Sequence, residues 1–114
     1  MSSGMNLVIY PVTDIAAATA TYTKLLGTRP YAEQPYYVGF RIGDFELGLD
    51  PNGHSLGLTG PVGYVDVEDI KEAVDTLDAN GAQIVQDVRD VGGGLLVAAV
   101  RDADGNVTGL RQQP

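Results

Sequence analysis

The sequence contains no cysteine and only one histidine, His54. The absence of cysteine excludes disulfides, thiolate nucleophiles and cysteine-ligated zinc or iron–sulfur sites. A single histidine excludes a metal site built from several histidines of one chain. The sequence also lacks an apolar run of about 18 residues, so no membrane-spanning helix is predicted.

Positive charge is scarce: seven Lys and Arg residues stand against fifteen Asp and Glu, for a net charge of −8. Such a field repels phosphate backbones and anionic lipids, so neither nucleic acid nor a membrane is expected as a partner. Residues 1–4 lack the basic and apolar segments of a signal peptide and are interpreted as a disordered start or a cloning remnant. Together with the missing cysteine, this predicts a cytoplasmic protein.

What the sequence does contain is an internal repeat. Val12–Ile15 and Val67–Ile70 read Val-Thr-Asp-Ile and Val-Glu-Asp-Ile, 55 positions apart. Each opens an amphipathic stretch that follows a short apolar run (Asn6–Tyr10, Val62–Val65) and ends at a glycine (Gly27, Gly81). Two copies are too few for a solenoid and indicate a tandem pair.

Both amphipathic stretches are predicted to be helices with one apolar stripe each. Oxygen atoms suited to capping stand at each start: Thr13 or Asp14 in the first copy, and Asp66, or Glu68 with Asp69, in the second. The terminal glycines suit the left-handed position that ends a helix. The expected stripes are Ile15, Ala18, Tyr22, Leu25 and Leu26, and Ile70, Ala73, Val74 and Leu77.

Each helix is followed by a predicted hairpin. Tyr36–Ile42 and Phe45–Leu49 flank a Gly43-Asp44 turn, and Leu95–Arg101 and Asn106–Leu110 flank a longer one. A third, less regular strand fits residues 29–33 and 83–88. The sequence therefore predicts one α+β domain of two βαβββ modules, residues 5–50 and 61–114, joined by a linker at 51–60.

These repeats resemble the vicinal oxygen chelate superfamily, which includes glyoxalase I, extradiol dioxygenases, and fosfomycin- and bleomycin-resistance proteins. The resemblance covers residues 5–112. It rests on the two helix starts, on Leu25–Gly27, on Gly81-Ala82 and on the closing turn Arg101–Val107. It implies a curved mixed sheet around a cavity, and a homodimer that often shares the cavity between chains.

In that superfamily the metal ligands come from the first and last strands of each half. The corresponding positions of this sequence are Leu7, Gly48, Val62 and Gly109. None of these side chains has a donor atom for a divalent cation. The resemblance therefore implies the metal-free branch, without cofactor or catalytic residue, in which the cavity binds a drug-like molecule as in antibiotic resistance.

Alternation along the strands assigns candidate ligand-binding residues to the face opposite the helices. These residues are Tyr37, Arg41, Glu46, Tyr64, Asp66 and Arg111. Aromatic faces, carboxylates and nearby glycines suit a flat, partly cationic ligand. The alternative is that Arg41 and Glu46 form an ordinary cross-strand pair on a solvated face.

Four further features have two interpretations each. Tyr31, Tyr36 and Tyr37 with Glu33 form either an aromatic wall or simply tyrosine-rich strands. Tyr10 and Tyr22 are assigned to the core. His54 is expected in an exposed loop. Gly92–Gly94 precedes a strand rather than a helix, so it is read as a pliable turn and not a phosphate-binding loop.

The leading hypothesis is thus a metal-free protein that sequesters a hydrophobic or cationic small molecule. An alternative is a lyase or isomerase with Glu46, Asp66 or Glu33 as general base, or with an unorthodox metal site. A third hypothesis is a dimeric interaction module without a ligand.

Overall fold

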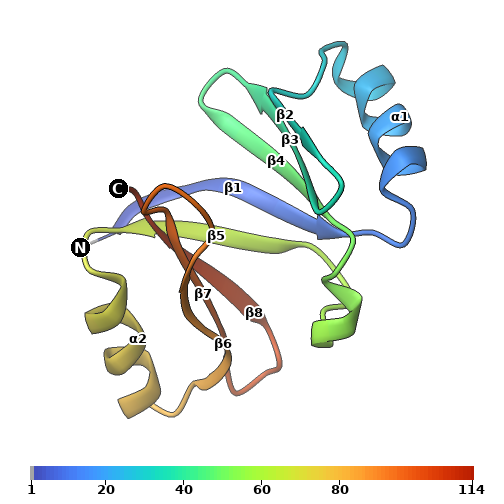
Figure 1. Cartoon of the computed structure of the whole chain (residues 1–114). Coiled ribbons are helices and arrows are strands. Elements are labelled where there is room, and N and C mark those ends of the chain that lie inside the picture. The colour runs from blue at the N-terminus through green and yellow to red at the C-terminus, as the bar shows by residue number, and fades with distance from the viewer. Residues whose placement is uncertain (1) are drawn as a thin grey trace. The chain divides into compact units, whose positions relative to one another are not determined.

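The computed structural model describes residues 2–114, which form two βαβββ modules in tandem (Figure 1). The first contains β1 (Ser2–Pro11), α1 (Ile15–Leu26), β2 (Ala32–Gln34), β3 (Tyr37–Ile42) and β4 (Phe45–Asp50). A short 3-10 helix, η1 (His54–Leu56), leads to the second. That module contains β5 (Val62–Val67), α2 (Ile70–Ala79), β6 (Gln83–Asp90), β7 (Leu96–Arg101) and β8 (Val107–Gln112). The predicted α+β class and the repeat are confirmed.

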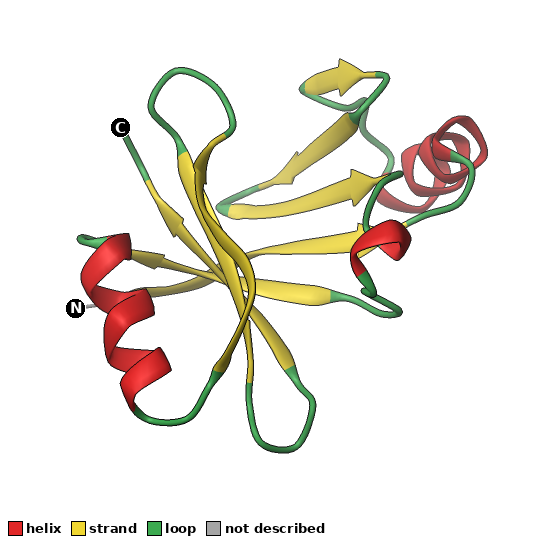
Figure 2. Ribbon diagram, turned by 60° about the horizontal axis from the view of Figure 1, so that its bottom comes forward, coloured by secondary structure: helices red, strands yellow, loops and turns green. Residues whose placement is uncertain are grey.

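The chain divides into two compact units. Asn6–Val62 is called the first module below, and Gly63–Pro114, with the start of β1 up to Met5, the second. The strand order is β2-β3-β4-β1 in the first and β5-β8-β7-β6 in the second. Within each of these groups of four strands, the pairs β1–β4 and β5–β8 are parallel and the others antiparallel, and a helix covers one face of each group (Figure 2).

Both helices begin at an aspartate, as two of the candidate caps predict. Asp14 Oδ1 accepts a hydrogen bond from Ala17 N (3.0 Å), and Asp69 Oδ1 accepts one from Glu72 N (3.1 Å). Each bond satisfies a backbone N–H that has no partner within the helix. At the other end of α1, Gly27 adopts φ 68° and its N–H donates to Thr23 O. Helix α2 ends at Ala79 and is capped by Asn80, one residue before the predicted glycine.

Helix α2 packs more tightly on the strands of its module than α1 does. The first core contains Val38, Phe40, Leu47 and Leu49, and the second contains Ile70, Val74, Ala98 and Leu110. None of the twelve residues of α1, all of which the structure describes, is fully buried, whereas α2 buries Ile70 and Val74. The predicted stripe of α2 is confirmed, but that of α1 is wrong at Leu25, which is 72% exposed.

The predicted register of the first hairpin is confirmed. Ile42 pairs with Phe45, Arg41 with Glu46, and Gly39 with Gly48. Since neighbouring residues of a strand point to opposite faces, Arg41, Glu46 and Gly48 share the face opposite α1. The same alternation in the second module places Tyr64, Asp66, Gly109 and Arg111 on the face opposite α2.

Two strands have other bounds than predicted, and the linker has a short helical turn. Strand β1 includes residues 2–4, where a disordered start was expected, and Met5 packs over Gly63 of β5. Strand β2 begins at Ala32 rather than at 29, because Pro30 has no N–H for a ladder. The expected linker 51–60 contains η1 and the buried side chain of Leu58. Among the described helices, none is long and apolar enough to cross a bilayer.

Candidate functional site

In the first module, the face opposite α1 contains a connected group of three side chains. The Tyr31 hydroxyl donates to Glu46 Oε1 (2.7 Å), and the Arg41 guanidinium carbon lies 4.0 Å from the centre of the Tyr31 ring. Arg41 Nη2 is 3.9 Å from Glu46 Oε1. The Arg41 side chain is 57% exposed and that of Glu46 is 15% exposed. The arginine therefore stacks from the solvent side on a phenol that is fixed by a carboxylate.

Two tyrosine rings on this face lie directly over glycines. Tyr31 covers Gly39, where an added Cβ would come within 2.9 Å of its ring. Tyr37 covers Gly48, where an added Cβ would overlap the phenol. Any side chain at either position would displace a ring, so the two glycines are required for this arrangement of aromatics.

The second module also has a tyrosine over a glycine, but this tyrosine comes from the first strand of the module, β5. The Tyr64 ring lies over Gly109 and leaves no space for a Cβ there, and Tyr64 is 6% exposed. Next to it, Arg111 Nε donates to Asp66 Oδ1 (2.6 Å) and Nη2 donates to Asp66 Oδ2 (3.2 Å). Arg111 is only 5% exposed, so this forked pair is a buried contact between β5 and β8.

The structure brings the six predicted site residues together as two groups of three. Tyr37, Arg41 and Glu46 share one face of the first module, and Tyr64, Asp66 and Arg111 share one face of the second. Of the predicted aromatic wall, Tyr36 is 63% exposed, and Glu33 is in register with the core residue Val38 on the other face. His54 is exposed, as expected.

Three residues of these faces were not among the predicted site residues. The sequence places Tyr31 only in the aromatic wall, whereas in the structure it is the partner of both Arg41 and Glu46. Arg101 and Arg89 share the face of Gly109 and Arg111, because paired residues of neighbouring strands point to the same face. Arg101 pairs with Val107, which alternates with Gly109, and Arg89 pairs with Val97, which in turn pairs with Arg111. The alternation of β7 could have identified Arg101.

The residues present do not fit a metal centre at the positions that the sequence comparison implies. Leu7 and Val62 are buried hydrocarbon side chains, each 3% exposed. At Gly48 and Gly109, tyrosine rings fill the space that a ligand side chain would need. Throughout the part of the chain that the structure describes, no three His, Asp or Glu side chains gather in a way that could hold an ion.

The family of the chain follows from its sequence and fold together. The sequence profile of the Glyoxalase/Bleomycin resistance protein/Dioxygenase superfamily matches residues 4–110, which include both modules. The chain belongs to this superfamily. The resemblance inferred from the repeats is thereby confirmed. No curated protein matches the sequence of this superfamily member.

Solved structures of the superfamily share its fold at low identity. Methylmalonyl-CoA epimerase from Mycobacterium tuberculosis is 17% identical with a TM-score of 0.73, and the match covers 99% of this chain and 89% of the epimerase chain. A superfamily member from Vibrio splendidus is 16% identical with a TM-score of 0.70, and the match covers 96% of this chain and 98% of the Vibrio chain. The Mn(II)-bound glyoxalase from Novosphingobium aromaticivorans is 17% identical with a TM-score of 0.69, covering 98% of this chain and 40% of its own. At these identities the likeness shows the fold alone.

Proposed function

We propose that this superfamily member binds a small hydrophobic or cationic molecule without a metal ion and without transforming it. The observation that carries the proposal is the pair of tyrosines over Gly48 and Gly109. Where a metal enzyme of this fold would need donor atoms, this chain has aromatic rings. Beside them, the exposed ring of Tyr31 offers flat apolar contact with a hydroxyl at the edge, which suits recognition of a planar molecule.

Arg41 indicates which ligand chemistry the first module favours. Its guanidinium is a planar, delocalised cation that stacks on Tyr31 beside Glu46. A planar organic cation placed there would gain the same cation–π contact and the same carboxylate. Since Arg41 is mostly exposed, its side chain can swing into solvent and vacate the ring. The net charge of −8 raises the local concentration of such cations.

The alternative of a carboxylate general base has less support. Glu46 already accepts a hydrogen bond from Tyr31 and faces Arg41, and both oxygens of Asp66 are bonded to Arg111. A substrate would have to compete for either carboxylate with these hydrogen-bond donors and guanidinium groups of the chain itself. Glu33 lies on the opposite face.

We also propose that the chain forms a homodimer that shares its ligand cavity and works in the cytoplasm. Sedimentation velocity tests the assembly, and a monomer at every concentration up to about 100 μM contradicts it. This part of the proposal is independent of the ligand's chemistry, since a monomer could still bind through Tyr31 and Glu46.

The test of binding is a fluorescence titration with proflavine, a planar cation, against 2-naphthalenesulfonate, a planar anion. We expect saturable binding of proflavine with Kd below about 100 μM, that is, a free energy of about −5.5 kcal/mol or better, and no binding of the anion. Tyr31→Leu should lower the affinity for proflavine at least tenfold, and Arg41→Ala should raise this affinity. Arg29→Ala, an exposed arginine outside the group, is the control and should change nothing.

Two results overturn the proposal. One is the absence of saturable proflavine binding below about 100 μM. The other is stoichiometric zinc, nickel or manganese in the purified protein, because an ion held through other donors would make catalysis the better explanation.

A further inference from the structure

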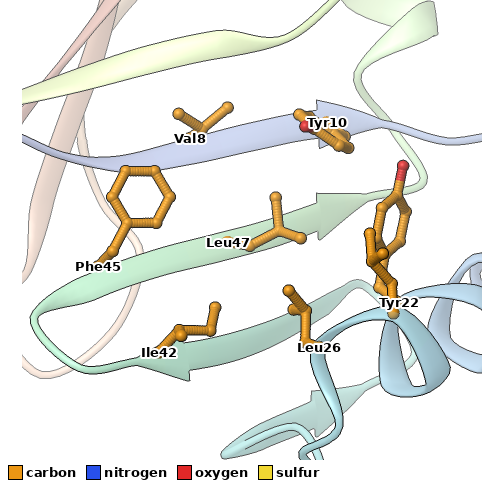
Figure 3. Close-up of a pocket in the computed structure, with 8 residues that line it drawn as sticks. Val8, Tyr10, Tyr22, Leu26, Ile42, Phe45 and Leu47 are labelled. Carbon is orange, nitrogen blue, oxygen red and sulfur yellow. The ribbon is translucent and has the colours of Figure 1, made fainter.

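The first module contains a pocket on the other side of its sheet, between α1 and the strands, with a volume of about 410 Å³ (Figure 3). This volume is within the range of small-molecule sites, roughly 300–1,000 Å³. All lining residues belong to the first module: Val8, Tyr10, Tyr22, Leu25, Leu26, Ile42, Phe45 and Leu47. The pocket is separate from the tyrosine and arginine group, which occupies the opposite face of the same strands.

The lining is apolar except at one end. Six of the eight residues are hydrocarbon side chains, and none of the eight is charged. Phe45 and Ile42 lie at one end, and Tyr10 and Tyr22 at the other (Figure 3). The two tyrosine rings meet edge to face, with their centroids 5.5 Å apart. A ligand that fits has an apolar body and a single uncharged hydrogen-bonding group at the hydroxyl end.

The second module provides an internal control, because it has the same architecture with polar residues at the mouth. Gly48 and Gly109 occupy equivalent positions in the last strand of each module, so Phe45 and Asn106, three residues before them, are equivalent. Their strand partners Gly39 and Ala99 are likewise equivalent, so Ile42 and Asp102, three residues after these partners, are equivalent too. Asn106 and Asp102 bond to each other through Asn106 Nδ2 (3.1 Å). In the first module, the equivalent Phe45 and Ile42 are 42% and 40% exposed.

Exposed hydrophobic side chains that gather around a hollow form an apolar patch, and such patches mark ligand-binding or interaction sites. We propose that this pocket, the α1 pocket, is a binding site for a neutral, elongated hydrophobic molecule with one alcohol, phenol or carbonyl group. A concave lining without charge favours such a ligand over an ion. The loose packing of α1, which leaves Leu25 exposed at the rim, gives the site room to adapt.

A second copy of the chain is a less suitable occupant. A stable interface buries about 800 Å² on each partner, with aromatic and aliphatic anchors spread over a broad patch. The exposed apolar residues of the α1 pocket are three, namely Leu25, Ile42 and Phe45, and they surround a hollow. A hollow of about 410 Å³ matches the size of a small molecule.

The experiment uses N-phenyl-1-naphthylamine, an uncharged probe that fluoresces in apolar surroundings, on the full chain. We expect saturable binding with one site per chain. Ile42→Asn and Phe45→Asn give the mouth of the α1 pocket the polarity of the second module. Each should lower the affinity for the probe roughly fivefold to tenfold. The matched controls are Ile84→Asn and Val91→Asn, because these side chains are 40% and 44% exposed but lie outside the pocket. They should leave the affinity unchanged.

Two further measurements separate the ligand classes and the sites. 1-Octanol should displace the probe at lower concentration than octanoate, and Tyr10→Phe with Tyr22→Phe should reduce this preference. Proflavine should not displace the probe, since it is directed at the opposite face. Equal losses in the pocket and control variants, stronger displacement by octanoate, or a change of oligomeric state in Ile42→Asn would each overturn the proposal.

Discussion

The ring of Tyr64 occupies the volume that any side chain at Gly109 would need. Tyr64 sits on β5 directly beside Gly109 on the parallel strand β8, and both are buried. In the first module the ring of Tyr37 covers Gly48 from the antiparallel strand β3, whose Gly39 is the residue paired with Gly48. In both halves a tyrosine ring thus fills the space over the glycine at a possible metal-ligand position, and the two rings reach it from strands that are not equivalent in the repeat.

Gly109→Ala should therefore destabilise the protein. The new methyl group overlaps a ring that has little room to move, and such overpacking costs about 1–3 kcal/mol. Urea denaturation measures this loss. Gly60→Ala is the control, since nothing lies within 4 Å of its added Cβ. In a Tyr64→Ala background the Gly109→Ala cost should nearly vanish, and a cost that persists there would mean that Tyr64 is not its cause.

The Asp66–Arg111 pair should contribute to folding whether or not it contacts a ligand. Asp66→Ala leaves the guanidinium of Arg111 buried without its carboxylate, which we expect to cost about 3 kcal/mol. Asp66→Ala with Arg111→Met should cost less than the single change, because no uncompensated charge remains. Chemical denaturation of the four proteins of this cycle gives the coupling energy. Additive losses would show that the two groups are not coupled.

The unequal packing of the two helices predicts unequal costs at equivalent isoleucines. Ile15 and Ile70 each follow the capping aspartate, but Ile70 is 0% exposed and Ile15 is half-buried. We expect Ile70→Ala to cost about 3–4 kcal/mol and Ile15→Ala about half as much. Equal losses in thermal or urea unfolding would contradict the looser packing of α1, on which the α1 pocket depends.

Much of this fold could be predicted from local chemistry. The two-residue Gly43-Asp44 turn fixes the register of the first hairpin, because a one-residue slip would turn every side chain to the wrong face. The aspartates at 14 and 69 fix the helix starts. These signals lie within a few residues of what they determine, so the sequence alone contains them.

The residues that were missed depend on contacts distant in sequence. Tyr31 precedes β2 and is placed by its backbone N–H, which donates to Gly39 O (2.8 Å). Arg89 follows register shifts in β6 at Ile84/Gln86 and Gln86/Arg89, which interrupt the alternation of faces. Leu25 fits the apolar period of α1, but Tyr22 and Leu26 are the residues of this turn that pack against the core, and Leu25 is left exposed beside them. Periodicity predicts the face to which each side chain points, but not which residues it contacts on that face.

The closing turn of the second module should give the protein an acid-sensitive element. Asp102 Oδ1 accepts hydrogen bonds from Asp104 N (3.0 Å) and Asn106 N (2.8 Å), and Oδ2 accepts one from Asn106 Nδ2 (3.1 Å). The bond from the Asn106 side chain is the main cause that lowers the pKa of Asp102 below its usual 3.8, followed by the backbone N–H groups. These bonds favour the charged form.

A carboxyl group whose pKa is lower in the folded chain stabilises the fold above its unfolded pKa, and this contribution disappears as the pH falls through the folded value. Wild type should thus be more stable than Asp102→Ala at pH 7, and the difference should shrink below about pH 3.8. Thermal unfolding of both proteins from pH 7 to pH 2.5 measures this. Asp104→Ala, which removes a neighbouring exposed carboxylate, is the control and should show no such convergence. A difference in Tm that stays constant across this range would mean that the turn depends on the shape of Asp102 rather than on its charge.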